Sequence, residues 1–275
     1  MKTRVLTAVV ALPPLLAILL FLPAIYTDIL VALLCAVAAH ELLWGTGVVK
    51  HPRLIIYTIV AAVLVPVWCY FGRNYAWGLA GVLIFSGLLF GELLISKAQV
   101  HFTKVMLCVA GGVMIPFLLT AIVRIRSMEL GQYLVMLPFV LAFASDTGAY
   151  FVGIRFGKTQ LAPTISPKKT VEGMVGGIVI AILATLGFGL VLDKGFGLSV
   201  NYWYALIYGT LGSVASVFGD LAFSAIKRQT GIKDYGRIIP GHGGVLDRFD
   251  SMTVVAPVAE VMLLLIPFAE KITNG

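Results

Sequence analysis

The sequence predicts an all-α fold, that of a polytopic integral membrane protein with about nine transmembrane helices. Of its 275 residues, 60% are hydrophobic and only 12% are charged. A soluble domain carries about 25% charged residues, and its core cannot bury this much apolar surface. Lipid is therefore the main solvent of the fold, and a soluble helical protein is the weaker interpretation.

Nine apolar stretches support this fold class, because each helix that crosses a membrane needs about 20 apolar residues. The stretches lie at roughly 4–24, 28–48, 54–72, 76–96, 104–123, 131–153, 172–192, 202–224 and 251–270. The first is too long for the apolar region of a signal peptide, so we expect it to be retained.

The connections between these stretches are short, apart from two long polar loops at 154–171 and 225–250. We expect about five N-terminal helices in residues 1–130 and a second group of helices, which carries both polar loops, in residues 131–275. The two parts are expected to form one integrated membrane unit.

The net charge of +7 predicts an orientation in the membrane. If the N-terminus lies inside, fifteen of the 20 Lys and Arg residues fall on the cytoplasmic side and five on the other. This is the positive-inside bias of membrane proteins. It predicts a protein of the cytoplasmic (inner) membrane with both polar loops inside, and it explains the charge better than nucleic-acid binding, so no nucleic acid is expected.

Two aspartates lie within apolar stretches, where an ionised side chain costs several kcal/mol. Asp146 lies in "FASDTGAYFVG", and Asp220 lies in "GSVASVFGDLAFSAIKR". The small residues around both aspartates allow helices to approach closely. An intramembrane ion pair or a helix cap would explain each aspartate alone, whereas a cytoplasmic-facing metal site would explain both.

The segment before the last apolar stretch combines acids, glycines and cations. Asp247 and Asp250 are three residues apart in "DRFD", so on a helix they share one face, and N-terminal capping is the simpler alternative. Gly243 and Gly244 of "PGHGG" allow backbone amides to approach an anion. Aspartates beside phosphate-binding cations indicate bridging Mg²⁺. The cations of this segment are Lys227, Arg228, Lys233, Arg237 and Arg248.

The other polar loop contains "GKT" at 157–159, which is not a phosphate-binding loop of the Walker A type, since position 152 is Val and a membrane span precedes it. The following "SPKKTVEG" is more informative. It places Ser166 in a turn, the adjacent cations Lys168 and Lys169 next, and Thr170 as a helix cap before glycines that permit close packing. Membrane anchoring by the lysines is the alternative explanation.

The stretch from Ser224 to Asp250, "SAIKRQTGIKDYGRIIPGHGGVLDRFD", resembles the signature of the CDP-diacylglycerol synthases, also called phosphatidate cytidylyltransferases. "SDTGAYFVG" and "FGK…LAPTISPKKTVEG" are similar to upstream blocks of the same family, so the resemblance covers about the last half of the chain. It implies that CTP and phosphatidate give CDP-diacylglycerol and diphosphate, in phospholipid biosynthesis. It also implies Mg²⁺ as cofactor, with a second cation left open, and favours a homodimer.

The resemblance also implies a set of site residues, with His242 as a phosphate contact rather than an essential base. The expected catalytic residues are Asp220, Asp247, Asp250, Lys227, Arg228 and His242. The expected substrate-binding residues are Lys168, Lys169, Ser166, Lys233, Gly243, Gly244 and Arg248. The expected metal ligands are Asp220, Asp250, Asp247 and Asp146.

Two other classes of protein compete with this interpretation. A transporter or channel also buries acids, but its charged groups should extend through the depth of the membrane. Here they gather toward one face. Another membrane lipid-phosphate transferase would share aspartate and magnesium chemistry but would lack the 224–250 signature.

Overall fold

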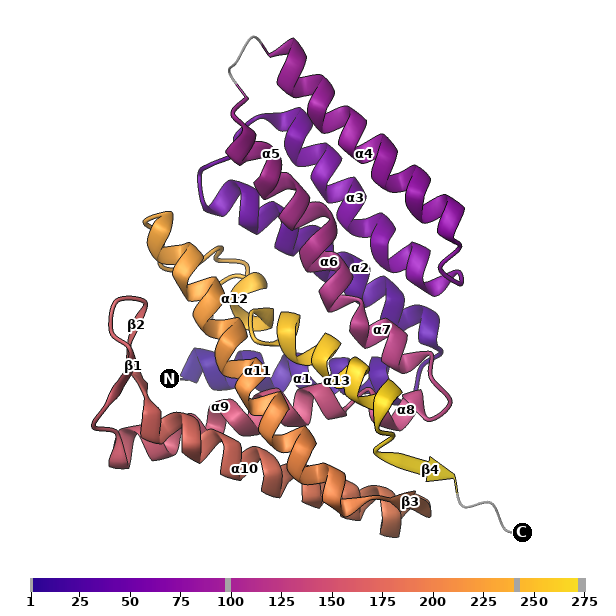
Figure 1. The fold of residues 1–275 in the computed structure, drawn as a ribbon, viewed down its shortest axis with the longest axis vertical. Coiled ribbons are helices and arrows are strands. Elements are labelled where there is room, and N and C mark those ends of the chain that lie inside the picture. The colour runs from indigo at the N-terminus through magenta and orange to yellow at the C-terminus, as the bar shows by residue number, and fades with distance from the viewer. Residues whose placement is uncertain (1, 97–99, 240–242, 272–275) are drawn as a thin grey trace. The chain divides into compact units, whose positions relative to one another are not determined.

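The all-α prediction is confirmed by a computed structural model that describes residues 2–96, 100–239 and 243–271 and is 75% helical (Figure 1). Within the described residues, 7 helices are long and apolar enough to cross a membrane. They are Ala24–Gly45, Pro52–Tyr70, Tyr75–Ile95, Phe102–Arg126, Gly131–Phe156, Val171–Gly195 and Tyr202–Gln229. The first and last predicted stretches correspond to α1 (Lys2–Leu20) and α13 (Met252–Leu265).

The chain divides into two compact units, each of which combines segments distant in sequence. The first contains Met1–Ser127 and Lys227–Phe249, and the second contains Met128–Ile226 and Asp250–Gly275. The segment between α11 and α12 (residues 230–245), called the glycine-rich segment below, therefore belongs with the N-terminal helices. The predicted boundary between residues 130 and 131 stays a prediction.

Within the described residues, the regular elements of the first unit are helices. Its elements are α1, α2 (Ala24–His40), η1 (Glu41–Gly45), α3 (Pro52–Tyr70), α4 (Tyr75–Ile95), α5 (Phe102–Val109), η2 (Ala110–Met114), α6 (Ile115–Leu119), α7 (Ala121–Arg126) and α12 (Leu246–Phe249). One π-helical turn, η1, follows α2, and another, η2, joins α5 to α6.

The second unit adds two small antiparallel pairs of strands to its helices. Its elements are α8 (Gly131–Leu134), α9 (Leu137–Phe156), β1 (Gln160–Ala162), β2 (Ser166–Thr170), α10 (Val171–Leu190), η3 (Val191–Gly195), β3 (Leu198–Val200), most of α11 (Tyr202–Gln229), α13 and β4 (Ala269–Lys271). The hairpin of β1 and β2 occupies the polar loop predicted at 154–171.

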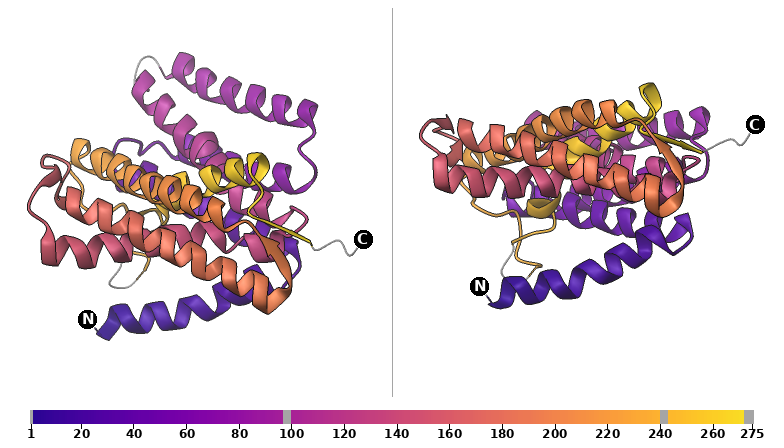
Figure 2. Two further views of the ribbon diagram at one scale, coloured as in Figure 1. Left: turned by 60° about the horizontal axis from the view of Figure 1, so that its bottom comes forward. Right: turned by 90° about the horizontal axis from the view of Figure 1, so that it is seen from below.

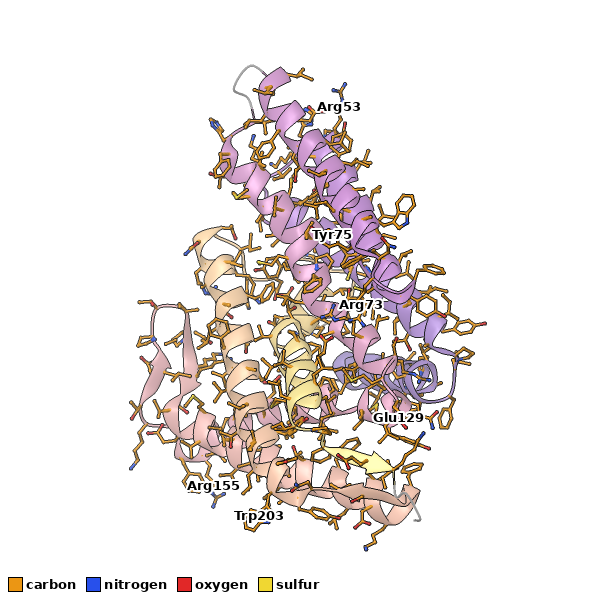
Figure 3. The ribbon with its side chains drawn as sticks, turned by 45° about the vertical axis from the view of Figure 1, so that its right-hand side comes forward. Arg53, Arg73, Tyr75, Glu129, Arg155 and Trp203 are labelled. Atoms are coloured by element: carbon orange, nitrogen blue, oxygen red, sulfur yellow. The ribbon has the colours of Figure 1, made fainter. Side chains whose placement is uncertain are left out.

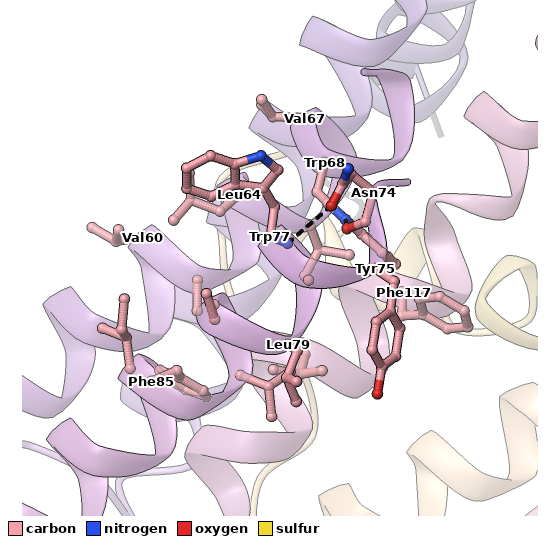
Figure 4. A pocket seen from close by; sticks show the side chains of 18 of the residues that line it. Val60, Leu64, Val67, Trp68, Asn74, Tyr75, Trp77, Leu79, Phe85 and Phe117 are labelled. Atoms are coloured by element: carbon pink, nitrogen blue, oxygen red, sulfur yellow. Dashed lines mark hydrogen bonds between the residues drawn. The ribbon is translucent and has the colours of Figure 1, made fainter. Parts of the chain in front are cut away.

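In the first unit, α3 and α4 pack side by side (Figure 1). An apolar groove of about 870 Å³ is lined mainly by residues of these two helices (Figure 4). At one end of the groove, Asn74 caps α4 by accepting hydrogen bonds from the N–H groups of Ala76 and Trp77. The Trp68 indole donates to the Asn74 carbonyl over 2.8 Å. Arg53 and Arg73, labelled in Figure 3, flank α3 at its two ends, as expected for a helix that spans an apolar layer.

In the second unit, α9 and α10 form a closely packed hairpin, and the two helices lie side by side in both views of Figure 2. Glycines make the approach possible. A Cβ added at Gly148 would lie 2.7 Å from Cβ of Ile180, and one added at Gly177 would lie 2.9 Å from the Ser145 carbonyl oxygen. The prediction that glycines at the start of α10 permit close packing is therefore confirmed.

Helix α11 continues about five residues beyond its predicted end and stops at Gln229. Gly231, at φ +71°, follows the helix, and the Ile232 N–H donates to the Lys227 carbonyl. A glycine in the left-handed region is a common way to end a helix. Lys227 and Arg228 consequently lie in the last turn of a helix, where cations complement the helix dipole, and not in a loop.

Candidate active site

Asp247 organises the segment between α11 and α12. Its side chain is buried, with 2% exposed, and its Oδ1 accepts a hydrogen bond from Nζ of Lys227 at 2.8 Å. Its Oδ2 accepts from the N–H groups of Tyr235 at 2.8 Å and Gly244 at 3.0 Å. Nζ of Lys227 also lies over the Tyr235 ring, 5.4 Å from its centroid. The carboxylate therefore fastens the glycine-rich segment to the end of α11.

Gly243 is required by the backbone at this position, because its φ of +88° lies in the left-handed region. A Cβ there would also lie 3.1 Å from Oδ2 of Asp247 and 3.5 Å from Oδ1 of Asp234. The sequence predicted that glycines let the backbone approach an anion. In the structure, the anionic groups close to Gly243 are carboxylates of the protein itself. His242 lies outside the described residues.

Four cations of the same segment are exposed, in contrast to the buried Lys227. Exposed ammonium and guanidinium groups along a short segment favour an anionic ligand. Their positions fit the predicted binding of phosphate groups. These residues are Arg228, Lys233, Arg237 and Arg248.

In the second unit, the hairpin of β1 and β2 supplies a cation to α11. Nζ of Lys169 lies 2.5 Å from Oδ2 of Asp220, and the Ser224 hydroxyl donates to Oδ1 of Asp220 over 3.1 Å. Successive side chains of a strand point to opposite faces, so the neighbouring Lys168 is directed elsewhere and is exposed. The two lysines therefore have different surroundings, with Lys169 half-buried against Asp220.

The base of this hairpin is held by the side chains of Thr170 and Glu172. Thr170 caps α10, as predicted, by accepting a hydrogen bond from the Gly173 N–H at 3.1 Å. Glu172 accepts from the N–H groups of Lys158 and Thr159. Two of the "GKT" amides are therefore bound to a carboxylate, in agreement with the rejection of a Walker A loop.

Asp146 on α9 is joined to α11 by the Ser216 hydroxyl, which donates to its Oδ1 over 3.0 Å. One residue away, the hydroxyls of Ser145 and Ser213 lie 2.8 Å apart. Small polar residues of two helices thus meet beside an aspartate, as the sequence indicated. Asp146 itself is exposed.

Asp250 lies between α12 and α13, so it does not share one regular helix with Asp247 as the spacing predicted. Its Oδ1 accepts from the following Ser251 N–H at 2.8 Å, a local bond that competes with helical pairing. On α11, Gly219 permits the chain to approach, since an added Cβ would lie 2.9 Å from the Asp250 carbonyl oxygen. The Asp250 backbone therefore lies against α11 at Gly219, the residue before Asp220 in sequence.

Within residues 2–96, 100–239 and 243–271, no three His, Cys, Asp or Glu side chains form a group that could hold a metal ion. Mg²⁺ commonly uses only one or two carboxylates together with water and phosphate oxygens. Asp220, whose side chain is 32% exposed, and the Ser224 hydroxyl that donates to it supply oxygen donors of this kind, and the Asp250 backbone lies against the same helix at Gly219. These residues fit Mg²⁺, because water and phosphate oxygens can reach the partly exposed Asp220. The Asp247 carboxylate is only 2% exposed and is enclosed by Lys227 and two backbone N–H groups.

One residue of this region was given no site role by sequence reasoning. Glu41 lies in the predicted apolar stretch at 28–48. In the structure it is 2% exposed, and its carboxylate accepts hydrogen bonds from the N–H groups of Val245 at 3.0 Å and Leu246 at 2.8 Å. An acid inside an apolar stretch is a signal for a buried partner, but the sequence does not show which one.

Comparison with known proteins identifies the class to which this fold and these residues belong. The Cytidylyltransferase family matches residues 2–266. The phosphatidate cytidylyltransferase of Staphylococcus epidermidis (strain ATCC 35984) is 34% identical over 275 residues, which cover 96% of this chain and 99% of that protein. The proteins of the same name from Staphylococcus saprophyticus and Staphylococcus aureus (strain COL) are 33% and 31% identical, with the same coverage. The chain belongs to the cytidylyltransferase family and is a membrane-embedded nucleotidyltransferase.

Proposed function

We propose that this protein transfers the cytidylyl group of CTP to phosphatidate, giving CDP-diacylglycerol and diphosphate, with Mg²⁺ as cofactor. The name and near-complete coverage of the curated relatives support the overall reaction. The observation that supports the chemistry is that α11 carries one member of each of two pairs of a carboxylate and a cation. Asp220 of α11 pairs with Lys169 of β2, and Lys227 of α11 pairs with Asp247 of α12.

The substrates dictate what the protein must do. The phosphate of phosphatidate is already anionic, so it can attack the α-phosphorus of CTP without a strong general base. Aligning two anions and neutralising their charge is then the main task of the protein. The exposed cations around the glycine-rich segment, together with Lys168 and Lys169, are assigned to the phosphate groups.

The metal is assigned to aspartates near the cytoplasmic end of α11. Asp220 and Asp250 are the first candidates, and Asp247 and Asp146 are the others. Bound Mg²⁺ would shield the triphosphate and stabilise the departing diphosphate. In the structure Lys169 neutralises Asp220, and this cation is free to pair with a phosphate oxygen once the carboxylate has another partner. Ser224 keeps the Asp220 carboxylate oriented in either case.

Labelled CTP tests the reaction and its position of attack. With phosphatidate and Mg²⁺, label at the α-phosphorus should move into the lipid phase, and label at the γ-phosphorus should stay in water as diphosphate. Transfer of the γ-label to lipid would refute attack at the α-phosphorus. No transfer of either label, together with cation flux through vesicles that contain the protein, would favour a transporter.

The orientation is part of the proposal, since the distribution of Lys and Arg puts both polar loops in the cytoplasm. Single cysteines at Gln160 and Gln229, in a variant without the three native cysteines, should react with an impermeant reagent only after the inner face is opened. Labelling of either position in intact cells would overturn the predicted topology.

A homodimer is proposed on the family resemblance alone. Chemical cross-linking in native membranes, followed by mass measurement in mild detergent, should give a species of twice the 29.5 kDa chain mass. A single protomer at all protein concentrations would contradict the dimer without affecting the proposed reaction.

A further inference from the structure

Glu41 joins the first half of the sequence to the segment that carries the family signature. It begins η1, the π-helical turn that ends the apolar span Ala24–Gly45. Its two carboxylate oxygens accept hydrogen bonds from consecutive N–H groups, those of Val245 and Leu246, which are 204 and 205 residues away in sequence. Because its side chain is buried, water does not compete for these bonds.

Glycines shape the space that the Glu41 carboxylate occupies. A Cβ at Gly244 would lie 2.5 Å from its Oε2, and a Cβ at Gly236 would collide with its Oε1. On the same turn, a Cβ at Gly45 would collide with the Tyr235 carbonyl oxygen. Residues 235, 236 and 244 of the glycine-rich segment are therefore packed closely around the Glu41 side chain and the η1 turn.

Asp247 holds the same segment from within. The Gly244 N–H donates to Asp247, and the next two N–H groups donate to Glu41. Three consecutive backbone donors are thus bound by two carboxylates. The segment is fixed immediately before Asp247 and Arg248, two of the residues expected to act on substrate or metal.

We propose that Glu41 is a positioning residue for the reaction, one that fixes the 243–247 backbone so that Asp247 and the cations of this segment are aligned with the substrates. This inference rests on the proposed function. It gives the N-terminal helices a part in catalysis, because the signature segment is held in place by a side chain that lies outside the signature. π-Helical turns are frequent at functional sites, and η1 is where this span meets the segment.

Glu41→Gln tests the proposal with little change in volume. An amide in place of one oxygen turns its NH2 group toward one of two N–H donors, so one hydrogen bond is lost and two donors face each other. We expect kcat/KM for CTP to fall about 10–100-fold, the scale of a small misplacement at an active site. Amide hydrogen exchange of residues 243–249 should become faster in the folded variant.

Glu92→Gln is the matched control. Glu92 is also a buried acid in the first unit, but its carboxylate accepts hydrogen bonds from Arg53 and Tyr57. We expect it to keep normal turnover and normal exchange of the 243–249 amides. If it loses as much turnover as Glu41→Gln, the effect belongs to buried acids in general and the proposal is overturned.

Gly244→Ala provides a second variant that keeps the Glu41 side chain but pushes its carboxylate away. If both substitutions act through one contact, the loss in the double variant should be well below the product of the two single losses. Multiplicative losses, or normal kcat per folded molecule with only a lower melting temperature, would reduce Glu41 to a structural role. The exchange measurement needs no substrate, so it tests the contact even if the assigned reaction fails.

Discussion

Asp247→Asn is expected to destabilise the protein much more than the same substitution at Asp220. The Lys227–Asp247 pair is closed over 2.8 Å, with side chains only 11% and 2% exposed. At this distance the attraction between unit charges is about 6 kcal/mol at an effective dielectric constant of about 20. Because desolvation offsets most of it, the relevant figure is the cost of leaving Lys227 buried without its partner, about 3–5 kcal/mol.

The Lys169–Asp220 pair provides the comparison. Its side chains are 25% and 32% exposed, so water solvates the remaining charge and the expected loss for Asp220→Asn is at most about 1 kcal/mol. Unfolding in detergent, followed by thermal or denaturant titration, should separate the two variants by at least about 2 kcal/mol. At roughly 2–4 °C per kcal/mol, this is a difference of several degrees in melting temperature.

A double variant shows whether the buried charge is the cause. Lys227→Met combined with Asp247→Asn removes both charges and should recover more than half of the stability that Asp247→Asn loses. Equal stability of Asp247→Asn and Asp220→Asn would refute the anchoring role of Asp247. A double variant less stable than Asp247→Asn would show that Lys227 contributes in another way.

Two further predictions concern the chemistry. Asp220→Asn and Asp250→Asn should each reduce turnover at least about a hundredfold, the scale of a lost transition-state charge contact, with stability nearly unchanged; near-normal turnover across a Mg²⁺ titration would exclude the ligand role. Lys169→Gln should raise the KM for CTP or phosphatidate, or lower kcat, more than Lys168→Gln does, because Lys169 contacts Asp220 whereas Lys168 is exposed. Kinetics unchanged from the parent protein in both variants would leave the lysines only a role in membrane anchoring.

Local patterns allowed much of the fold to be predicted. Apolar runs of about 20 residues predicted the helices, since lipid requires every backbone group of a span to be paired within it. Thr170 was predicted as a cap because its hydroxyl needs only the Gly173 N–H three residues on. The same local reasoning failed at Asp250, where a bond to the next residue ended the helix that the i, i+3 spacing assumed.

The partners of the site residues were harder to predict, because they come from distant parts of the sequence. Ser216 lies four residues before Asp220 on α11, but its hydroxyl donates to Asp146 on another helix. Lys169 was expected to bind phosphate, and in the structure it pairs with Asp220. A sequence shows which side chains need a partner inside a membrane. Packing between helices decides which partner each one receives.

The family match extends from residue 2 to residue 266, yet the residues that carry the resemblance lie in the last half of the chain. A signature that worked alone would leave the N-terminal helices as a simple anchor. The structure gives a physical reason for their retention, since the segment 227–249 belongs to the same compact unit as residues 1–127. Its consecutive amides at 245 and 246 are held by Glu41. Two glycines of the signature, Gly236 and Gly244, make room for the Glu41 carboxylate of the protein itself. We therefore assign anion binding to the exposed cations around them.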